Sequence, residues 1–131
     1  MGKLYANSGN NEESIELYRS AYEMFESIEN VHGVANTLTA MGIIYSNTGK
    51  IDMAISKIQD AYDLNEKLDN IDQMAIDMEY LGSLYSGIDK LPLALDSLQK
   101  SKTLYEKLGQ QPKIEMCENL IKEIKEKMQH T

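Results

Sequence analysis

Apolar residues recur along the chain at helical spacing, in stripes separated by short polar breaks. In the middle of the chain Leu38, Met41 and Tyr45 step by three and four residues, which places them on one face of a helix. A break follows at Gly49, where glycine can adopt the left-handed geometry that ends a helix. The next stripe begins at Ala54. The pattern therefore predicts a chain of helices joined by tight turns.

Acidic and proline residues mark where these helices begin. Asp52 stands in an expected first turn, where the helix dipole favours an acid, and Pro92 suits the opening turn of a later helix. The resulting prediction is an all-α protein with helices near 12–28, 31–48, 51–68, 71–87, 91–108 and 112–128, and a short helix near 3–8.

The stripes belong to an internal repeat. Met41-Gly42-x-x-Tyr45 recurs as Leu81-Gly82-x-x-Tyr85, and Met1-Gly2-x-x-Tyr5 precedes it at the same offset of 40 residues. A fixed offset of this size is the signature of a repeat protein in which each repeat is one helix pair.

The repeat resembles the tetratricopeptide repeat. Leu38-x-x-Met41-Gly42-x-x-Tyr45, followed by Ala54-x-x-x-Ile58, is similar to that family's pattern. The period is 40 residues instead of about 34, and the proline that usually ends the second helix is missing, as in a longer class of the repeat. HEAT and armadillo repeats have comparable periods but lack this motif.

The resemblance implies a right-handed α-α superhelix, a helix-turn-helix solenoid of about three repeats at residues 1–30, 31–70 and 71–110. Residues 112–128 form one more amphipathic stripe. Lys122 and Lys125 stand where the earlier repeats have glycine and tyrosine, which forbids another close helix. We therefore expect a capping helix that turns charge to solvent.

The resemblance also implies a binding groove lined by the first helix of each repeat, here called the A helix. Family members usually bind peptide segments there. Solvation alone would equally explain the small polar side chains at these positions, because a fold only weakly implies a function. The expected groove residues are Lys3, Asn7, Asn36, Thr39, Ile43, Ser46, Asn47, Ile76, Glu79, Ser83 and Ser86.

Composition narrows the function classes. The net charge is −8, with 21 acidic and 13 basic residues, and Arg19 is the single arginine. This balance argues against nucleic acid as a partner, because nucleic-acid binding needs clustered cations. No apolar run approaches the ~20 residues of a membrane helix. We expect a soluble, cytoplasmic protein with no membrane partner.

The sequence offers no constellation for catalysis. His32 and His130 are the two histidines, and Cys117 is the single cysteine, placed on an apolar stripe. A metal or acid-base site needs a second convergent group. We therefore expect no enzymatic activity, no metal and no cofactor, and an inert buried thiol at Cys117.

Three function classes stay open. The leading one is a protein-interaction module that binds a peptide or helical segment of a partner in the groove. The second is a sensor or regulatory domain of a larger signalling protein, and the third is a self-assembling structural repeat. A ligand that presents a terminal carboxylate is disfavoured, because Glu79 and Ser83 occupy positions where chaperone-binding family members carry cations.

The first repeat is expected to leave an apolar edge open, because its A helix is too short to cover its partner. The residues of this self-association edge are Met24, Phe25 and Ile28. Two explanations fit: the chain is cut from a longer array, or it pairs with another copy as a homodimer through its N-terminal repeat.

Overall fold

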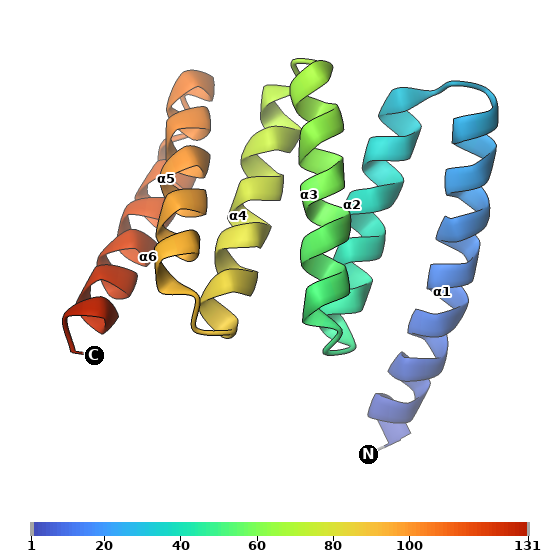
Figure 1. The fold of residues 1–131 in the computed structure, drawn as a ribbon, viewed down its shortest axis with the longest axis horizontal. Coiled ribbons are helices and arrows are strands. Elements are labelled where there is room, and N and C mark those ends of the chain that lie inside the picture. The colour runs from blue at the N-terminus through green and yellow to red at the C-terminus, as the bar shows by residue number, and fades with distance from the viewer. Residues whose placement is uncertain (1, 131) are drawn as a thin grey trace. The chain divides into compact units, whose positions relative to one another are not determined.

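The structure, a computed structural model, describes the backbone of residues 2–130 and the side chains of residues 11–130. The described backbone forms six helices and no strand (Figure 1). They are α1 (Gly2–Ser27), α2 (Val31–Asn47), α3 (Ile51–Lys67), α4 (Ile71–Gly87), α5 (Leu91–Leu108) and α6 (Gln111–Gln129). The all-α fold built from consecutive helix pairs is confirmed. The handedness of the superhelix stays a prediction.

The turns repeat with the same 40-residue period as the apolar stripes. The residues that end the B helices, the second helices of each pair, include Asp69 with φ 55° and Gly109 with φ 68°. Gly49 has φ 80°, so the left-handed residue expected after α2 is present. At the start of α2 the side chain of Asn30 accepts a hydrogen bond from the Gly33 amide at 2.9 Å, which caps the helix.

One prediction about the helices is wrong. We expected a short helix near 3–8 and a second one from residue 12, but α1 runs without interruption from Gly2 to Ser27, as the blue ribbon of Figure 1 shows. A helix of about six residues is far below the 12–15 residues that are marginally stable in water. A break would also expose the unpaired backbone groups of two new helix ends.

The chain divides into two compact parts, Met1–Leu64 and Asn65–Thr131. In the N-terminal part α1 packs against α2, and Gly42 of α2 faces Ile58 and the Ala54 carbonyl oxygen of α3. This is the close helix contact that the sequence motif predicts.

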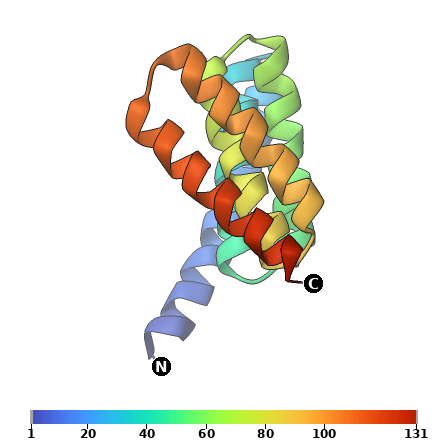
Figure 2. The ribbon, with the colours of Figure 1, turned by 90° about the vertical axis from the view of Figure 1, so that its left-hand side faces the viewer.

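In the C-terminal part α4 packs against α5, and α6 packs against α5; Figure 2 shows α6 running obliquely across α5. A Cβ atom added to Gly82 would lie 2.6 Å from Cγ of Leu98, so glycine is required where α4 meets α5. The core of this part includes Leu91, Ala94, Leu98 and Ile124.

Candidate functional site

In the N-terminal part, the expected groove positions lie on α2. Asn36 and Asn47 are exposed, and Ile43 and Ser46 are half-buried. Thr39 is only 8% exposed, so little of its side chain is open to a groove ligand. Thr39 lies one turn from Ala35 and Gly42, on the packed side of α2. Lys3 and Asn7 lie outside the residues whose side chains the structure describes.

In the C-terminal part, two expected groove residues line a pocket of about 290 Å³ between α4, α5 and α6. Ser83 is exposed and Ser86 is half-buried, and both stand on α4. The buried side chains of Leu98 and Ile124 form an apolar floor. Ile76, another expected groove residue, is half-buried. It lies on α4, one turn before Glu79.

The opposite wall of this pocket comes from α6, which we expected to act only as a cap. Glu123 and Lys127 line the pocket, and both side chains are exposed. The sequence carried the signal for them: a step of 40 residues leads from Ser83 to Glu123 and from Gly87 to Lys127. The last helix therefore continues the row of groove positions.

The side chains around the pocket mouth are available to a ligand. Within residues 11–130, Ser83, Ser86, Glu123 and Lys127 make no hydrogen bond or ion pair through their side chains. A pocket with an apolar floor and a few polar groups at its rim is typical of binding sites. We call this set of residues the α4–α6 pocket.

Glu79 has a different environment from the one expected. Its Oε1 atom accepts a hydrogen bond from the Tyr105 hydroxyl at 2.7 Å and lies 3.5 Å from Nζ of Lys113. Lys113 also lies 5.9 Å from the centre of the Tyr105 ring. Burial, followed by the bond to Glu79, raises the pKa of Tyr105 well above its usual range. The negative charge of Glu79 is thus compensated, so it repels an anionic ligand less than the sequence suggested.

Cys117 is fully buried beside Ser101, whose hydroxyl lies 3.7 Å from the thiol sulfur. The Ser101 hydroxyl donates to the Ala75 carbonyl oxygen at 2.8 Å. Burial raises the pKa of the Cys117 thiol, which keeps it protonated and poorly nucleophilic at neutral pH. The expected burial of Cys117 is confirmed.

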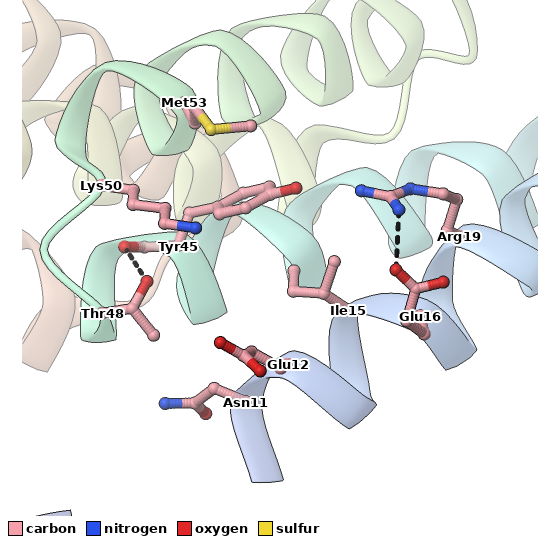
Figure 3. Close-up of a pocket in the computed structure, with 9 residues that line it drawn as sticks. All are labelled: Asn11, Glu12, Ile15, Glu16, Arg19, Tyr45, Thr48, Lys50 and Met53. Carbon is pink, nitrogen blue, oxygen red and sulfur yellow. Dashed lines mark hydrogen bonds and ion pairs between the residues drawn. The ribbon is translucent and has the colours of Figure 1, made fainter. Parts of the chain in front are cut away.

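A second pocket, of about 420 Å³, lies in the N-terminal part and is drawn in Figure 3. Ile15, Tyr45 and Met53 supply its apolar surface, and charged side chains surround them. Arg19 pairs with Glu16 at 2.8 Å, and Nζ of Lys50 lies 6.0 Å from the centre of the Tyr45 ring. Acids and cations balance around this pocket, so it has no preference for one charge.

The self-association edge is partly exposed. Met24 and Ile28 are exposed, at 54% and 62%. Phe25 is half-buried, because its ring lies against Gly33 of α2, where an added Cβ would approach Cδ2 of the ring to 2.8 Å. Met24 and Ile28 therefore supply more of the exposed apolar surface of this edge than Phe25 does.

The described residues carry neither a metal-binding cluster nor a membrane-spanning helix. Among the described residues, no three His, Cys, Asp or Glu side chains gather where they could hold a metal ion. No helix in the described part of the chain combines the length and the apolar character needed to cross a bilayer.

Comparison with known proteins identifies the family. The sequence model described as "Tetratricopeptide repeat" matches residues 1–67, just over half of the chain. The chain belongs to the tetratricopeptide repeat family. In general terms the chain is therefore a protein-interaction repeat module. Members of the family are typically non-enzymatic scaffolds.

A solved structure supports the fold of this tetratricopeptide repeat protein. The crystal structure of BtubC (BKLC) from P. vanneervenii is similar with a TM-score of 0.66 and 18% identity, over 98% of this chain and 62% of that one. The chain therefore spans less than two thirds of BtubC, and at this identity the likeness shows the fold alone.

Two further solved structures match over most of their length but superpose poorly. Two crystal structures of MamA match 100% and 90% of this chain and 98% and 90% of their own chains, at 16% and 15% identity. Their TM-scores are 0.31 and 0.27, too low to carry an argument. No curated protein matches the sequence.

Proposed function

We propose that this tetratricopeptide repeat protein binds a segment of a partner protein in the α4–α6 pocket. The observation that carries the proposal is the combination of an apolar floor with four unpaired polar side chains at the mouth. Polar groups held on helices around a preformed cavity fix the orientation of a ligand, while the apolar floor contributes the burial.

The chemistry of the pocket fits a peptide. The hydroxyl groups of Ser83 and Ser86 can both donate to and accept from a peptide backbone. The floor formed by Leu98 and Ile124 favours one aliphatic side chain of the partner. Glu123 and Lys127, one turn apart on α6, supply one charge of each sign. A short peptide held in so small a site is expected to bind with a dissociation constant on the order of 1 μM.

Binding, without catalysis, is the activity that we propose. It is supported by the scaffold role of the family and by the buried, protonated thiol of Cys117. The net charge of −8 supports a protein partner over nucleic acid. A cytoplasmic location is supported by a single cysteine that needs no disulfide.

A library of displayed peptides, selected against the 131-residue chain, tests the proposal. Calorimetry with a selected peptide should show at least tenfold weaker binding to Ser83→Trp, which fills the mouth of the pocket. Ser56→Trp is the matched control, because Ser56 is an exposed serine of α3 outside the pocket. Asp60→Lys, also exposed on α3, serves as a charge control.

Both controls should bind like the parent, and all variants should keep the parent's helical circular dichroism. Equal weakening by Ser83→Trp and Ser56→Trp would show that the peptide does not use the α4–α6 pocket. On α2, Ile43→Lys with Asn47→Glu tests in the same way whether the groove positions of the N-terminal part contribute.

Self-association is a second candidate function, favoured by one specific observation. Met24 on α1 and Ile28 directly after it expose apolar surface, and Leu17 on α1 is 72% exposed. Apolar surface of this kind usually marks an interaction site. We propose that a second copy of the chain covers this edge. Sedimentation equilibrium over a wide concentration range tests the proposal, and a strict monomer at high concentration would contradict it.

A further inference from the structure

The uncovered face of α1 is a single stripe. Leu17 and Met24 are seven residues apart, a spacing that puts them on one side of α1. Ile28 follows directly after the helix, and its amide donates to the Met24 carbonyl oxygen. Leu17, Met24 and Ile28 are 72%, 54% and 62% exposed. Val31, at the start of α2, extends the stripe and is 40% exposed. We call these four residues the α1 stripe.

The repeat shows that this face is normally covered. By the 40-residue register, Leu17 and Met24 correspond to Ser97 and Leu104 of α5. Those two residues are only 5% and 7% exposed. α1 is thus equivalent to a B helix, but residues 2–10 continue it as one helix and do not fold back as the A helix of its repeat.

A second open surface lies at the other end of the chain. It is a pocket of about 390 Å³ on α5 and α6. Three lysines, Lys102, Lys122 and Lys125, and two acids, Glu118 and Glu126, line it around Ile121, so cations exceed acids by one. Lys102 pairs with Glu118 at 3.5 Å. Within residues 11–130, Lys122 and Lys125 form no ion pair. We call this surface the α6 face.

The two surfaces are complementary in charge. The described part of α1 carries one base, Arg19, which already pairs with Glu16. Its acids are Glu12, Glu13, Glu16, Glu23 and Glu26. The α6 face offers two unpaired ammonium groups beside half-buried Ile121. Complementary potentials of this kind steer association and set its orientation.

We infer that the chain assembles head to tail, with the α1 stripe of one copy docked on the α6 face of the next. This inference rests on the proposed self-association and names the surface that covers the stripe. Contact between two α1 helices is disfavoured, because it would bring glutamates of both copies together. Such a head-to-tail contact is heterologous, so each added copy presents a fresh surface and the assembly lengthens with concentration.

The lysines of the α6 face determine which interactions hold the contact together. Lys122 occupies the position of Gly82, so an incoming helix cannot approach α6 as closely as α5 approaches α4. Lysine side chains can lie along apolar surface and extend their charge beyond it. The contact therefore depends on ion pairs between lysines and glutamates, and it should weaken as salt shortens the range of these charges.

Two complementary variants test the orientation. In the stripe variant, Leu17→Glu with Met24→Glu blocks the α1 stripe. In the face variant, Lys122→Glu with Lys125→Glu blocks the α6 face. Lys90→Glu with Lys107→Glu is the matched control for the face variant, because it changes the net charge by the same amount at exposed lysines away from the α6 face. Sedimentation velocity gives the mass distribution of each, and circular dichroism checks that each is folded.

The parent and the control should form species whose mean mass rises with concentration and falls in high salt. Each blocked variant alone should be a monomer, with association weakened at least tenfold. An equimolar mixture of the two should form a one-to-one dimer and nothing larger, because it contains one intact contact.

Two results would overturn the inference in distinguishable ways. Self-association of the face variant at the parent's strength, with the stripe variant monomeric, would place the contact between two α1 helices and leave the proposed self-association standing. A parent that stays monomeric at every concentration would contradict both head-to-tail docking and the proposed self-association. A mixture that gives no dimer would also contradict head-to-tail docking.

Discussion

Asn65 and Asp77 form a polar pair inside the C-terminal part, where both side chains are almost completely buried. Nδ2 of Asn65 donates a hydrogen bond to Oδ2 of Asp77 at 2.8 Å, while Oδ1 of Asn65 has no partner. In the next repeat the equivalent residues are Tyr105 and Cys117. The pair is therefore specific to this repeat.

Replacing Asn65 by leucine should destabilise the chain by about 2 kcal/mol, because a buried carboxylate loses a hydrogen-bond donor. Urea unfolding measures the change. The double variant Asn65→Leu with Asp77→Leu should recover much of the loss, since removing both partners of a buried polar pair is often close to neutral. If Asn65→Leu and the parent unfold at the same urea concentration, the bond contributes nothing.

Cys117 predicts how stability changes at alkaline pH. Burial raises the pKa of its thiol in the folded chain above the ordinary value of 9.0. The neutral thiol contributes fully to the free energy of unfolding below pH 9. This contribution is lost as the pH rises, because the unfolded chain then binds fewer protons than the folded chain. The stability advantage of the parent over Cys117→Ala should therefore shrink between pH 7 and pH 10. An advantage that stays constant would show that the thiol ionises equally in both states.

At the level of helices, two glycines mark where neighbouring helices touch. Gly42→Leu should cost about 3 kcal/mol or more, because the new side chain would overlap Ile58 and the Ala54 carbonyl oxygen, and backbone yields less easily than a side chain. Gly87→Leu is the matched control: Gly87 also stands in a helix, but no atom lies within 4 Å of an added Cβ. Thermal melting compares them, and equal melting temperatures would contradict the packing of α2 on α3.

The bounds of α4 could be predicted closely from the sequence, whereas those of α1 could not. The prediction for α4 was 71–87, and the structure has Ile71–Gly87. Periodicity works there because the buried face of α4 includes Met78 and Leu81. In α1 the Asn-Ser-Gly-Asn segment at residues 7–10 resembles the Asn-Thr-Gly-Lys break before α3, but the helix continues through it. A local signal for a turn is thus overridden by the rest of the chain.

The candidate site was only half predictable. Ser83 and Ser86 could be predicted from the register of the A helices. Glu123 and Lys127 were not predicted, because the lysines of α6 indicated a capping helix without a binding role. The spacing of residues within one helix does not show which residues of another helix they meet. For the same reason the sequence gave no indication that Tyr105 and Lys113 hold Glu79, which lies 26 and 34 residues away along the chain.

At the scale of the whole chain, burial is distributed unevenly. Among the described residues of α1, Ile15 is the one buried hydrophobic side chain. α4 and α5 bury many more, among them Met78, Leu81, Leu98 and Leu104. In repeat proteins each helix pair is stabilised by its nearest neighbours. Local unfolding should therefore begin at α1 and reach α4 and α5 last.

Amide hydrogen exchange at low protein concentration measures this order directly. Protection should be lowest in α1 and highest in α4 and α5, because exchange follows the free energy of local opening and that free energy grows with buried apolar contact. Raising the protein concentration should increase protection in α1 and α6 while leaving α4 unchanged, since docking the α1 stripe on the α6 face of another copy covers only those two ends. Uniform protection along the chain would contradict the first expectation. A concentration effect confined to α1 would favour contact between two α1 helices.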